Sequence, residues 1–358
     1  MKSTQMLHDI GQSLWLDNIT RELLASGTLD RYIHELSVTG LTSNPTIFEH
    51  AIRNSTAYDA AIGTGRKTGK TAESLFFELA LEDITRAADL FRAIYESTDG
   101  VDGYVSLEVS PLLAHDAKTT LSQAIELHGR AGRPNLFIKI PGTAEGLPAI
   151  ENAIFAGIPV NVTLLFSREQ YLAAAEAYLR GIERRIAAGL RANVGSVASV
   201  FVSRWDTAVS AKVPAALANQ LGIAVARRTY RAYNELIASP RYQRVLNAGA
   251  RPQRLLFAST GTKDPKASDV LYVEALAAPL TVNTLPEATL KAFADHGHVD
   301  AAARIDFEAA EAAIAKFTAA GVDLATLAAT LQDEGAASFA KSWNDLMAVI
   351  ASKIKTLE

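Results

Sequence analysis

Hydrophobic residues in this chain follow two alternating patterns. Short apolar runs bounded by turn residues predict buried strands, and stretches with apolar residues every three or four positions predict amphipathic helices. We expect strands at 15–17, 38–42, 104–109, 135–140, 159–166, 197–202, 255–258 and 280–282. We expect helices at 19–26, 29–36, 72–95, 115–131, 144–156, 169–190 and 206–238, the last broken near Pro214, helix fragments with an exposed loop at 51–70, and Ala-rich helices in several pieces from about 285 to 357.

The alternation of strands with helices determines the predicted fold class. Successive strand–helix units imply a parallel sheet with right-handed crossovers. Eight such units in 358 residues favour an α/β fold of the closed (β/α)8 barrel type, with additional helices at the C-terminus. An open doubly wound sheet is the alternative, although no glycine-rich dinucleotide fingerprint follows any strand. We therefore expect one barrel domain spanning residues 1–358.

Composition narrows the class of protein. Apolar residues make up 49% of the chain, and 35 basic against 39 acidic residues give a net charge of −4. The near balance argues against a nucleic-acid-binding protein but leaves room for a local basic pocket. The absence of cysteine excludes disulfides, thiolate metal sites and thiol nucleophiles. Residues 1–12 lack a signal pattern and no apolar run has membrane-spanning length, so we expect a cytoplasmic protein without a membrane partner.

The strand at 135–140 contains one residue that does not fit its surroundings. Lys139 lies among Phe137, Ile138 and Ile140, with no carboxylate in the run, and the strand stops at a Pro-Gly turn. Burial of an ammonium is costly unless the group is paired or loses its proton. A desolvated lysine offers a neutral amine that attacks carbonyls. The alternative is a strand-end lysine that reaches water.

Other predicted strands also carry polar groups near their C-terminal ends, where barrel enzymes place their catalytic residues. The set comprises Asp17, Asn44, Glu108, Lys139, Asn161, Thr163, Ser199, Arg204, Ser259 and Lys263. Asn161 and Thr163 are two positions apart and share one face of their strand. Two carboxylates and one amine that converge in a pocket would support imine chemistry with acid–base assistance.

Each of these residues also has a structural interpretation. Asp17 and Asn44 are residue types that cap helices, and each precedes a predicted helix. Glu108 is a candidate partner for an arginine, and Arg204 for Asp206 in a surface ion pair. The segment 259–262 fits a plain tight turn. The coincidence of polar groups on five consecutive strands favours a functional site over these separate explanations.

Three segments resemble the transaldolase family. TGLTSNPTIF at 39–48 is similar to one family signature, and LFIKIPGTAEGL at 136–147 is similar to the signature that holds the Schiff-base lysine. NVTLLFS at 161–167 also fits. The resemblance runs from about Leu14 to beyond the eighth strand. It implies a (β/α)8 barrel, no metal and no organic cofactor.

The resemblance also implies an activity and a role for each matching residue. The activity is transfer of a dihydroxyacetone unit from a ketose phosphate (sedoheptulose 7-phosphate or fructose 6-phosphate) to an aldose phosphate (glyceraldehyde 3-phosphate or erythrose 4-phosphate), in the pentose phosphate pathway. By this resemblance Lys139 forms the imine, Asp17 is the base for C–C cleavage, and Glu108 with Thr163 handles protons and water. The implied substrate-binding residues are Asn44 and Asn161 for hydroxyls, and Ser199, Arg204 and Ser259 for phosphate.

One departure from the family pattern concerns phosphate binding. Many members carry a second arginine shortly after the serine that corresponds to Ser259, whereas this chain has Thr260, Gly261 and Thr262 there. This feature resembles the longer subgroup of the family. The nearest cation is Lys263, and we expect Lys263 or loop amides to supply the second phosphate contact.

Two other functions remain open at this point. A sugar-phosphate aldolase of the fructose-6-phosphate aldolase type would release free dihydroxyacetone, but such relatives tend to lack a glutamate equivalent to Glu108. A catalytically inactive barrel that only binds sugar phosphates has no need of an amine such as that of Lys139. The Ala-rich C-terminal helices would either cover the barrel or pack against a second subunit in a homodimer.

Overall fold

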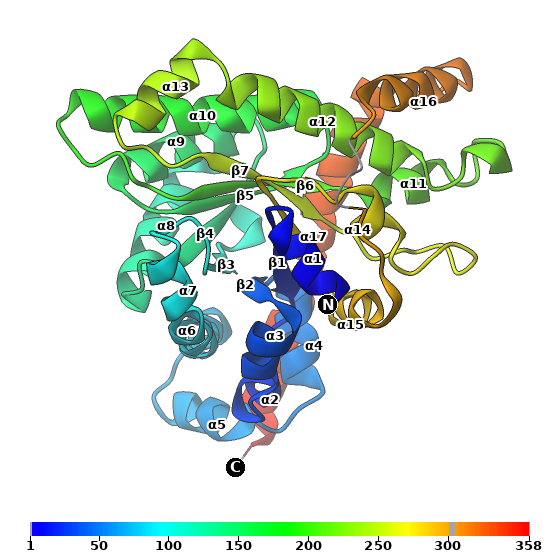
Figure 1. Cartoon of the computed structure of the whole chain (residues 1–358). Coiled ribbons are helices and arrows are strands. Elements are labelled where there is room, and N and C mark those ends of the chain that lie inside the picture. Colours follow the sequence, from blue (N-terminus) through cyan, green and yellow to red (C-terminus); the bar gives the residue numbers. More distant parts are fainter. Residues whose placement is uncertain (1, 301–304, 358) are drawn as a thin grey trace.

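The computed structural model describes residues 2–300 and 305–357. Eight parallel strands close into a barrel in the order β1-β2-β3-β4-β5-β6-β7-β8 (Figure 1). The strands are β1 (Gln12–Asp17), β2 (Val38–Thr42), β3 (Val105–Glu108), β4 (Leu136–Pro141), β5 (Val160–Leu165), β6 (Ser196–Phe201), β7 (Gln253–Ala258) and β8 (Thr281–Leu285). The predicted (β/α)8 class is thus confirmed, and the alternative of an open sheet is wrong because β1 pairs with β8.

Helices surround the barrel in the order that the periodicity predicts. They are α1 (Ser3–Asp9), α2 (Arg21–Ala25), α3 (Thr28–Leu36), α4 (Pro45–Arg53), α5 (Asp59–Lys67), α6 (Ala72–Leu90), α7 (Arg92–Ser97), α8 (Ala117–Ala131), α9 (Gly146–Ala156), α10 (Arg168–Ala187), α11 (Ser203–Val209), α12 (Leu221–Ile237), α13 (Pro240–Asn247), α14 (Leu271–Ala275), α15 (Glu287–His296), α16 (Phe307–Ala319) and α17 (Leu324–Thr356), with short 3₁₀ turns at Pro111–Leu113 and Ala215–Leu217. Residues 51–70 are mostly helical, with less loop than we expected.

Two predicted boundaries differ from the structure for physical reasons. The helix expected at 72–95 divides at the buried residue Phe91, which ends α6 and precedes α7. The last strand was expected to end at 282 but continues through Asn283 and Thr284 to Leu285. These two polar residues are buried, and Asn283 accepts a hydrogen bond from Thr260 Oγ1 at 2.9 Å. The hydroxyl of Thr284 lies 2.6 Å from that of Thr42. Hydrogen-bond partners of this kind allow polar side chains to be buried in the barrel.

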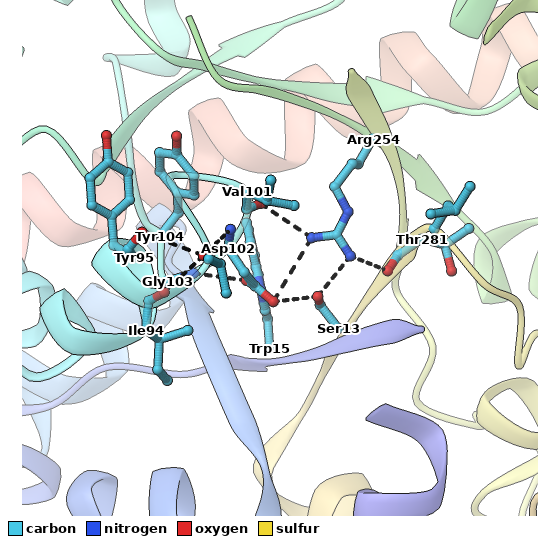
Figure 2. A network of polar contacts seen from close by, with 12 residues as sticks. Ser13, Trp15, Ile94, Tyr95, Val101, Asp102, Gly103, Tyr104, Arg254 and Thr281 are labelled. Carbon is cyan, nitrogen blue, oxygen red and sulfur yellow. Dashed lines mark hydrogen bonds and ion pairs between the residues drawn. The ribbon is translucent and has the colours of Figure 1, made fainter. Parts of the chain in front are cut away.

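The N-terminal end of the barrel is filled by aromatic rings and a buried polar network (Figure 2). The rings of Tyr104 and Phe137 are stacked with centroids 3.9 Å apart, and Trp15 lies against Phe137. The Asp102 carboxylate accepts hydrogen bonds from Trp15 Nε1 at 2.9 Å and from the Ser13 hydroxyl. Arg254 donates to Ser13 Oγ at 2.7 Å and lies 3.9 Å from Asp102 Oδ2. The rings and the network therefore have a structural role at this end of the barrel.

Replacement of Arg254 by methionine should lower the free energy of unfolding by about 3 kcal/mol, because it leaves the Asp102 charge buried without its counter-ion. Urea denaturation at neutral pH measures the loss. Arg251→Met is the matched control, since Arg251 pairs with the exposed side chain of Asp99. Such a surface pair contributes less than about 1 kcal/mol. Equal losses in the two variants would contradict the structural role of the network.

The C-terminal helix α17 packs along α4, α5 and α6, and it is drawn in red in Figure 1. Trp343 on α17 contacts the rings of Phe76 and Phe77 on α6. Earlier along the same helix, Gln332 Nε2 donates to the carbonyl oxygens of Gly142, at 3.1 Å, and Leu164, at 2.8 Å. These carbonyls lie just beyond β4 and near the end of β5, so α17 reaches the C-terminal end of the barrel.

Over residues 2–300 and 305–357, no single helix is both long and apolar enough to cross a membrane. The pair α16 and α17 meets the length and apolarity criteria only when taken together, and the two helices are bent by 89° relative to each other.

Candidate active site

A polar pocket of about 150 Å³ opens at the C-terminal ends of the strands. Seven of the predicted site residues line it: Asp17, Asn44, Lys139, Ser199, Arg204, Ser259 and Lys263. A larger hollow of about 650 Å³ lies at the opposite end of the barrel, with mostly apolar walls beside Arg254 and Asp102. The smaller pocket is the candidate active site, because of the two it alone combines a lysine amine with a carboxylate, Asp17, and the further cations Arg204 and Lys263.

Lys139 forms an ion pair that the sequence did not reveal. Its Nζ lies 3.3 Å from Glu108 Oε2 and donates to the carbonyl oxygen of Ser43 at 3.2 Å. Lys139 and Glu108 are directly opposite each other on β4 and β3, and both are buried, at 6% and 4% exposure. The expectation of an unpaired lysine was therefore wrong, because its partner comes from the neighbouring strand. The pairing makes burial of the ammonium possible and places a carboxylate beside the atom that would react.

Glu108 retains hydrogen-bonding capacity despite this contact. Lys139 Nζ and Glu108 Oε2 are close enough for an ion pair but are not aligned for a hydrogen bond. Neither carboxylate oxygen of Glu108 has a hydrogen-bond partner among the described residues. Burial raises the pKa of Glu108, the charge of Lys139 opposes the rise, and the charge of Asp17 adds to it. A buried carboxyl group with a raised pKa and free oxygen atoms is suited to proton transfer.

Asp17 is the second carboxylate of the pocket. Its Oδ1 accepts a hydrogen bond from Thr42 Oγ1 at 2.7 Å. Burial raises the pKa of Asp17, whereas Lys139, the Thr42 hydroxyl and Lys263 oppose the rise. The helix-cap interpretation does not hold for this residue, because the cap of α2 is Thr20, whose hydroxyl accepts from the Leu23 amide. Asp17 is thus available to a ligand.

Asn44 has both of the roles considered for it. Its Oδ1 accepts from the Ile47 amide at 3.0 Å and caps α4, with Pro45 in the first turn. The same residue lines the pocket. The cap fixes the orientation of the side chain, so its amide nitrogen remains as a possible donor to a ligand.

Asn161 and Thr163 lie below the pocket, fully buried on β5. The amide of Asn161 donates to Ser106 Oγ at 3.1 Å and accepts from Ser199 Oγ at 2.7 Å, which links β3, β5 and β6. The Thr163 hydroxyl has no hydrogen-bond partner within the part of the chain that the structure describes. Neither side chain is part of the pocket wall, in contrast to Ser199, which lines it.

Arg204 is held by aromatic rings and not by a carboxylate. Its Cζ lies 5.2 Å from the Phe201 ring centroid and 5.9 Å from that of Phe339. The surface ion pair with Asp206 does not form, because that carboxylate accepts from the Leu221 and Gly222 amides and the Tyr272 hydroxyl. Burial lowers the pKa of Arg204, and an arginine remains charged despite such a shift. Within residues 2–300 and 305–357 no carboxylate pairs with Arg204, so its donors are available to a ligand in the pocket.

Ser259 and Lys263 lie on the loop after β7. Ser259 has a left-handed backbone with φ of 56°, and its hydroxyl lies 2.8 Å from the hydroxyl of Ser203, the residue before Arg204. Lys263 is exposed and has neither a hydrogen bond nor an ion pair within residues 2–300 and 305–357. The loop therefore brings a hydroxyl and a second cation to the side of the pocket occupied by Arg204.

The sequence did not single out several further residues of the pocket, among them Thr42, Phe201, Thr284 and Phe339. Thr42 ends β2 and lies two positions before Asn44, and residues two apart on a strand share a face. Its position at the strand end was therefore a usable signal. Phe339 carried no such signal, because it comes from the middle of α17. Its ring centroid lies 5.5 Å from Lys139 Nζ.

Comparison with known proteins identifies the family of the chain. A profile described as Transaldolase/Fructose-6-phosphate aldolase matches residues 14–350. The chain is 45% identical to a transaldolase of Thermobifida fusca (strain YX), over 98% of both chains. It is 42% identical to "Transaldolase 2" of Nostoc punctiforme, over 97% of this chain and 96% of the other. The chain therefore belongs to the transaldolase/fructose-6-phosphate aldolase family.

Proposed function

We propose that this protein is a transaldolase that moves a dihydroxyacetone unit between sugar phosphates through a lysine Schiff base. The observation that carries the proposal is the buried Lys139–Glu108 pair, whose lysine lines a pocket that also contains Asp17. Relatives at 40–45% identity over nearly the whole chain are named transaldolases, which supports the same assignment. The pocket cations Arg204 and Lys263 are suited to a phosphorylated substrate.

The proposed reaction begins with addition of the neutral Lys139 amine to the ketose carbonyl at C2. Before this addition Glu108 takes one proton from the Lys139 ammonium. After it, the C2 oxygen receives one proton from the added nitrogen and the proton held by Glu108, so that water leaves and a protonated imine forms. The 3.3 Å separation of the two groups allows this exchange directly or through one water molecule. The protonated imine then withdraws electrons from the bond that will break.

Asp17 is assigned to the C–C bond cleavage. It removes the proton of the C4 hydroxyl, the C3–C4 bond breaks, and its electrons move into the imine to give an enamine on Lys139. The aldose phosphate formed in this step leaves. A second aldose phosphate accepts the three-carbon unit by the reverse steps, and water releases the product from Lys139.

One assay distinguishes this proposal from its rivals. Fructose 6-phosphate is supplied with and without erythrose 4-phosphate, and heptulose phosphate and free dihydroxyacetone are measured. A transaldolase forms heptulose phosphate only with the acceptor and releases little dihydroxyacetone without it. Dihydroxyacetone release at the same rate in both conditions would identify an aldolase, and neither product would identify a binding protein.

Replacement of Arg204 by alanine should lower catalytic efficiency for phosphorylated ketoses by at least about tenfold, because a charge-assisted hydrogen bond contributes roughly 1.5–3 kcal/mol. The loss for unphosphorylated fructose should be much smaller. Lys263→Ala should show a smaller loss of the same selectivity. Arg228→Ala serves as control, since Arg228 pairs with Glu311 outside the pocket. Equal losses for phosphorylated and free sugars in Arg204→Ala would show that this residue supports the fold and not phosphate binding.

A further inference from the structure

One face of α17 lies against the active-site pocket. Gln332, Gly335 and Phe339 are spaced by three and four positions and therefore lie on the same side of the helix. Gln332 bonds to the carbonyls of Gly142 and Leu164, which anchors this face beside the ends of β4 and β5. The helix is thus held in place over the strands that carry Lys139 and Thr163.

Gly335 allows α17 to approach Arg204. A Cβ atom at this position would lie 2.9 Å from Leu164 Cδ2 and 3.1 Å from Arg204 Nη1. Real side chains essentially avoid separations of this size, so a larger residue would displace the guanidinium or the helix. The close approach brings Phe339, one turn later, to the pocket.

Phe339 places one ring next to two of the pocket's cations, Lys139 and Arg204. Its centroid is 5.5 Å from Lys139 Nζ and 5.9 Å from Arg204 Cζ, and the side chain is 6% exposed. The ring of Phe201 lies on Arg204 as well, with its centroid 6.5 Å from that of Phe339. An aromatic face near a cation is attractive by about 0.5–2 kcal/mol, and an imine on Lys139 retains a positive charge.

We propose that Phe339 controls the fate of the covalent intermediate, by shielding the Lys139 adduct from water until an aldehyde acceptor binds. This inference rests on the proposed transaldolase function. After C3–C4 cleavage the retained three-carbon unit has no phosphate, so Arg204 no longer holds it and only the lysine bond and the pocket walls do. The apolar ring beside Nζ is the part of the wall that α17 contributes.

Two reactions compete for this intermediate. In transfer, the enamine carbon forms a new bond to the aldehyde carbon of the acceptor, and the aldehyde oxygen takes up a proton. In release, the enamine carbon takes a proton, water adds to the imine carbon, the C–N bond breaks, and free dihydroxyacetone leaves with Lys139 restored as an amine. Removal of the ring admits water and therefore favours release.

The test is the ratio of dihydroxyacetone released to heptulose phosphate formed, with fructose 6-phosphate and erythrose 4-phosphate both present. Phe339→Ala should raise this ratio by about tenfold, the equivalent of about 1.4 kcal/mol. Phe339→Leu keeps apolar volume and loses the ring face, so its ratio should lie between those of the wild type and the alanine variant. Borohydride trapping on Lys139 should persist in both variants.

Trp343→Phe is the matched control on the same helix. It alters an aromatic ring that packs against Phe76 and Phe77 on α6, outside the pocket, so it should leave the product ratio unchanged. A wild-type ratio in both Phe339 variants, with trapping intact, would overturn the inference. If the alanine variant does not fold, the leucine variant alone decides in the same way. Failure of the proposed function is distinguishable, because then the wild-type protein would neither trap ketose on Lys139 nor form heptulose phosphate.

Discussion

Lys139→Arg should abolish transfer, with a loss of at least about 10⁴-fold in kcat, as is usual when a covalent catalytic group is removed. Arginine stays protonated and cannot add to a carbonyl, so no imine forms. Because arginine keeps the positive charge next to Glu108, the fold should be retained. Sodium borohydride added with fructose 6-phosphate should attach the sugar to the wild-type peptide that contains Lys139 and leave the variant unlabelled.

Lys139→Met is the companion variant, which removes both the amine and the positive charge, whereas Lys139→Arg removes only the amine. It should be equally inactive, but it leaves Glu108 buried with no counter-ion. Breaking a buried ion pair in this way lowers the free energy of unfolding by about 3 kcal/mol, so this variant should also be less stable than Lys139→Arg. Labelling of Lys263 or another lysine in the wild-type protein would refute the assignment of Lys139.

Substitution of the two carboxylates should impair different steps. Asp17→Ala should still accumulate the borohydride-trappable adduct but cleave it about 10²–10⁴-fold more slowly, the usual contribution of a general base. Glu108→Ala should form the adduct itself slowly. Rapid-quench measurements of adduct formation and triose release in a single turnover separate the two steps. The opposite pattern would exchange the two roles.

The raised pKa values of these groups give the same experiment a pH dependence. Asp17 acts as a base only when it is ionised, and burial raises its pKa above the ordinary value of 3.8. The rate of the cleavage step should therefore fall on acidification at a higher pH than it would with an exposed aspartate. In Asp17→Ala this fall should be absent from the residual cleavage rate.

The sequence predicted the fold and the strand-end residues because both follow from local patterns. Periodicity identified the eight strands, and position at a strand end identified Asp17, Glu108 and Lys139 as candidates. The Lys139–Glu108 pair was not predictable in this way. It depends on the register between β3 and β4, which the pattern within either strand does not determine.

The contributions of α17 were missed for a related reason. Phe339 is an ordinary apolar residue in an Ala-rich helix, and its function depends on where α17 crosses the barrel. Asn161 illustrates the reverse case. Its polar side chain on β5 suggested a ligand contact, but its hydrogen bonds to Ser106 and Ser199 are internal to the barrel.

Barrel closure has a consequence for how the chain folds. The β1–β8 seam joins Gln12 to Thr281, which are separated by 269 positions along the chain. Contacts between such distant segments form late, because the entropy cost of closing the long loop precedes any gain from the contact. Asp17, Glu108 and Lys139 all lie on the consecutive strands β1 to β4, and Asp17 is opposite Thr42 on β2. These strands can pair before the seam closes, whereas the pocket residues Ser259 and Thr284 lie after β7 and on β8 and complete the pocket only when it does. Recovery of catalytic activity should lag behind recovery of helical structure.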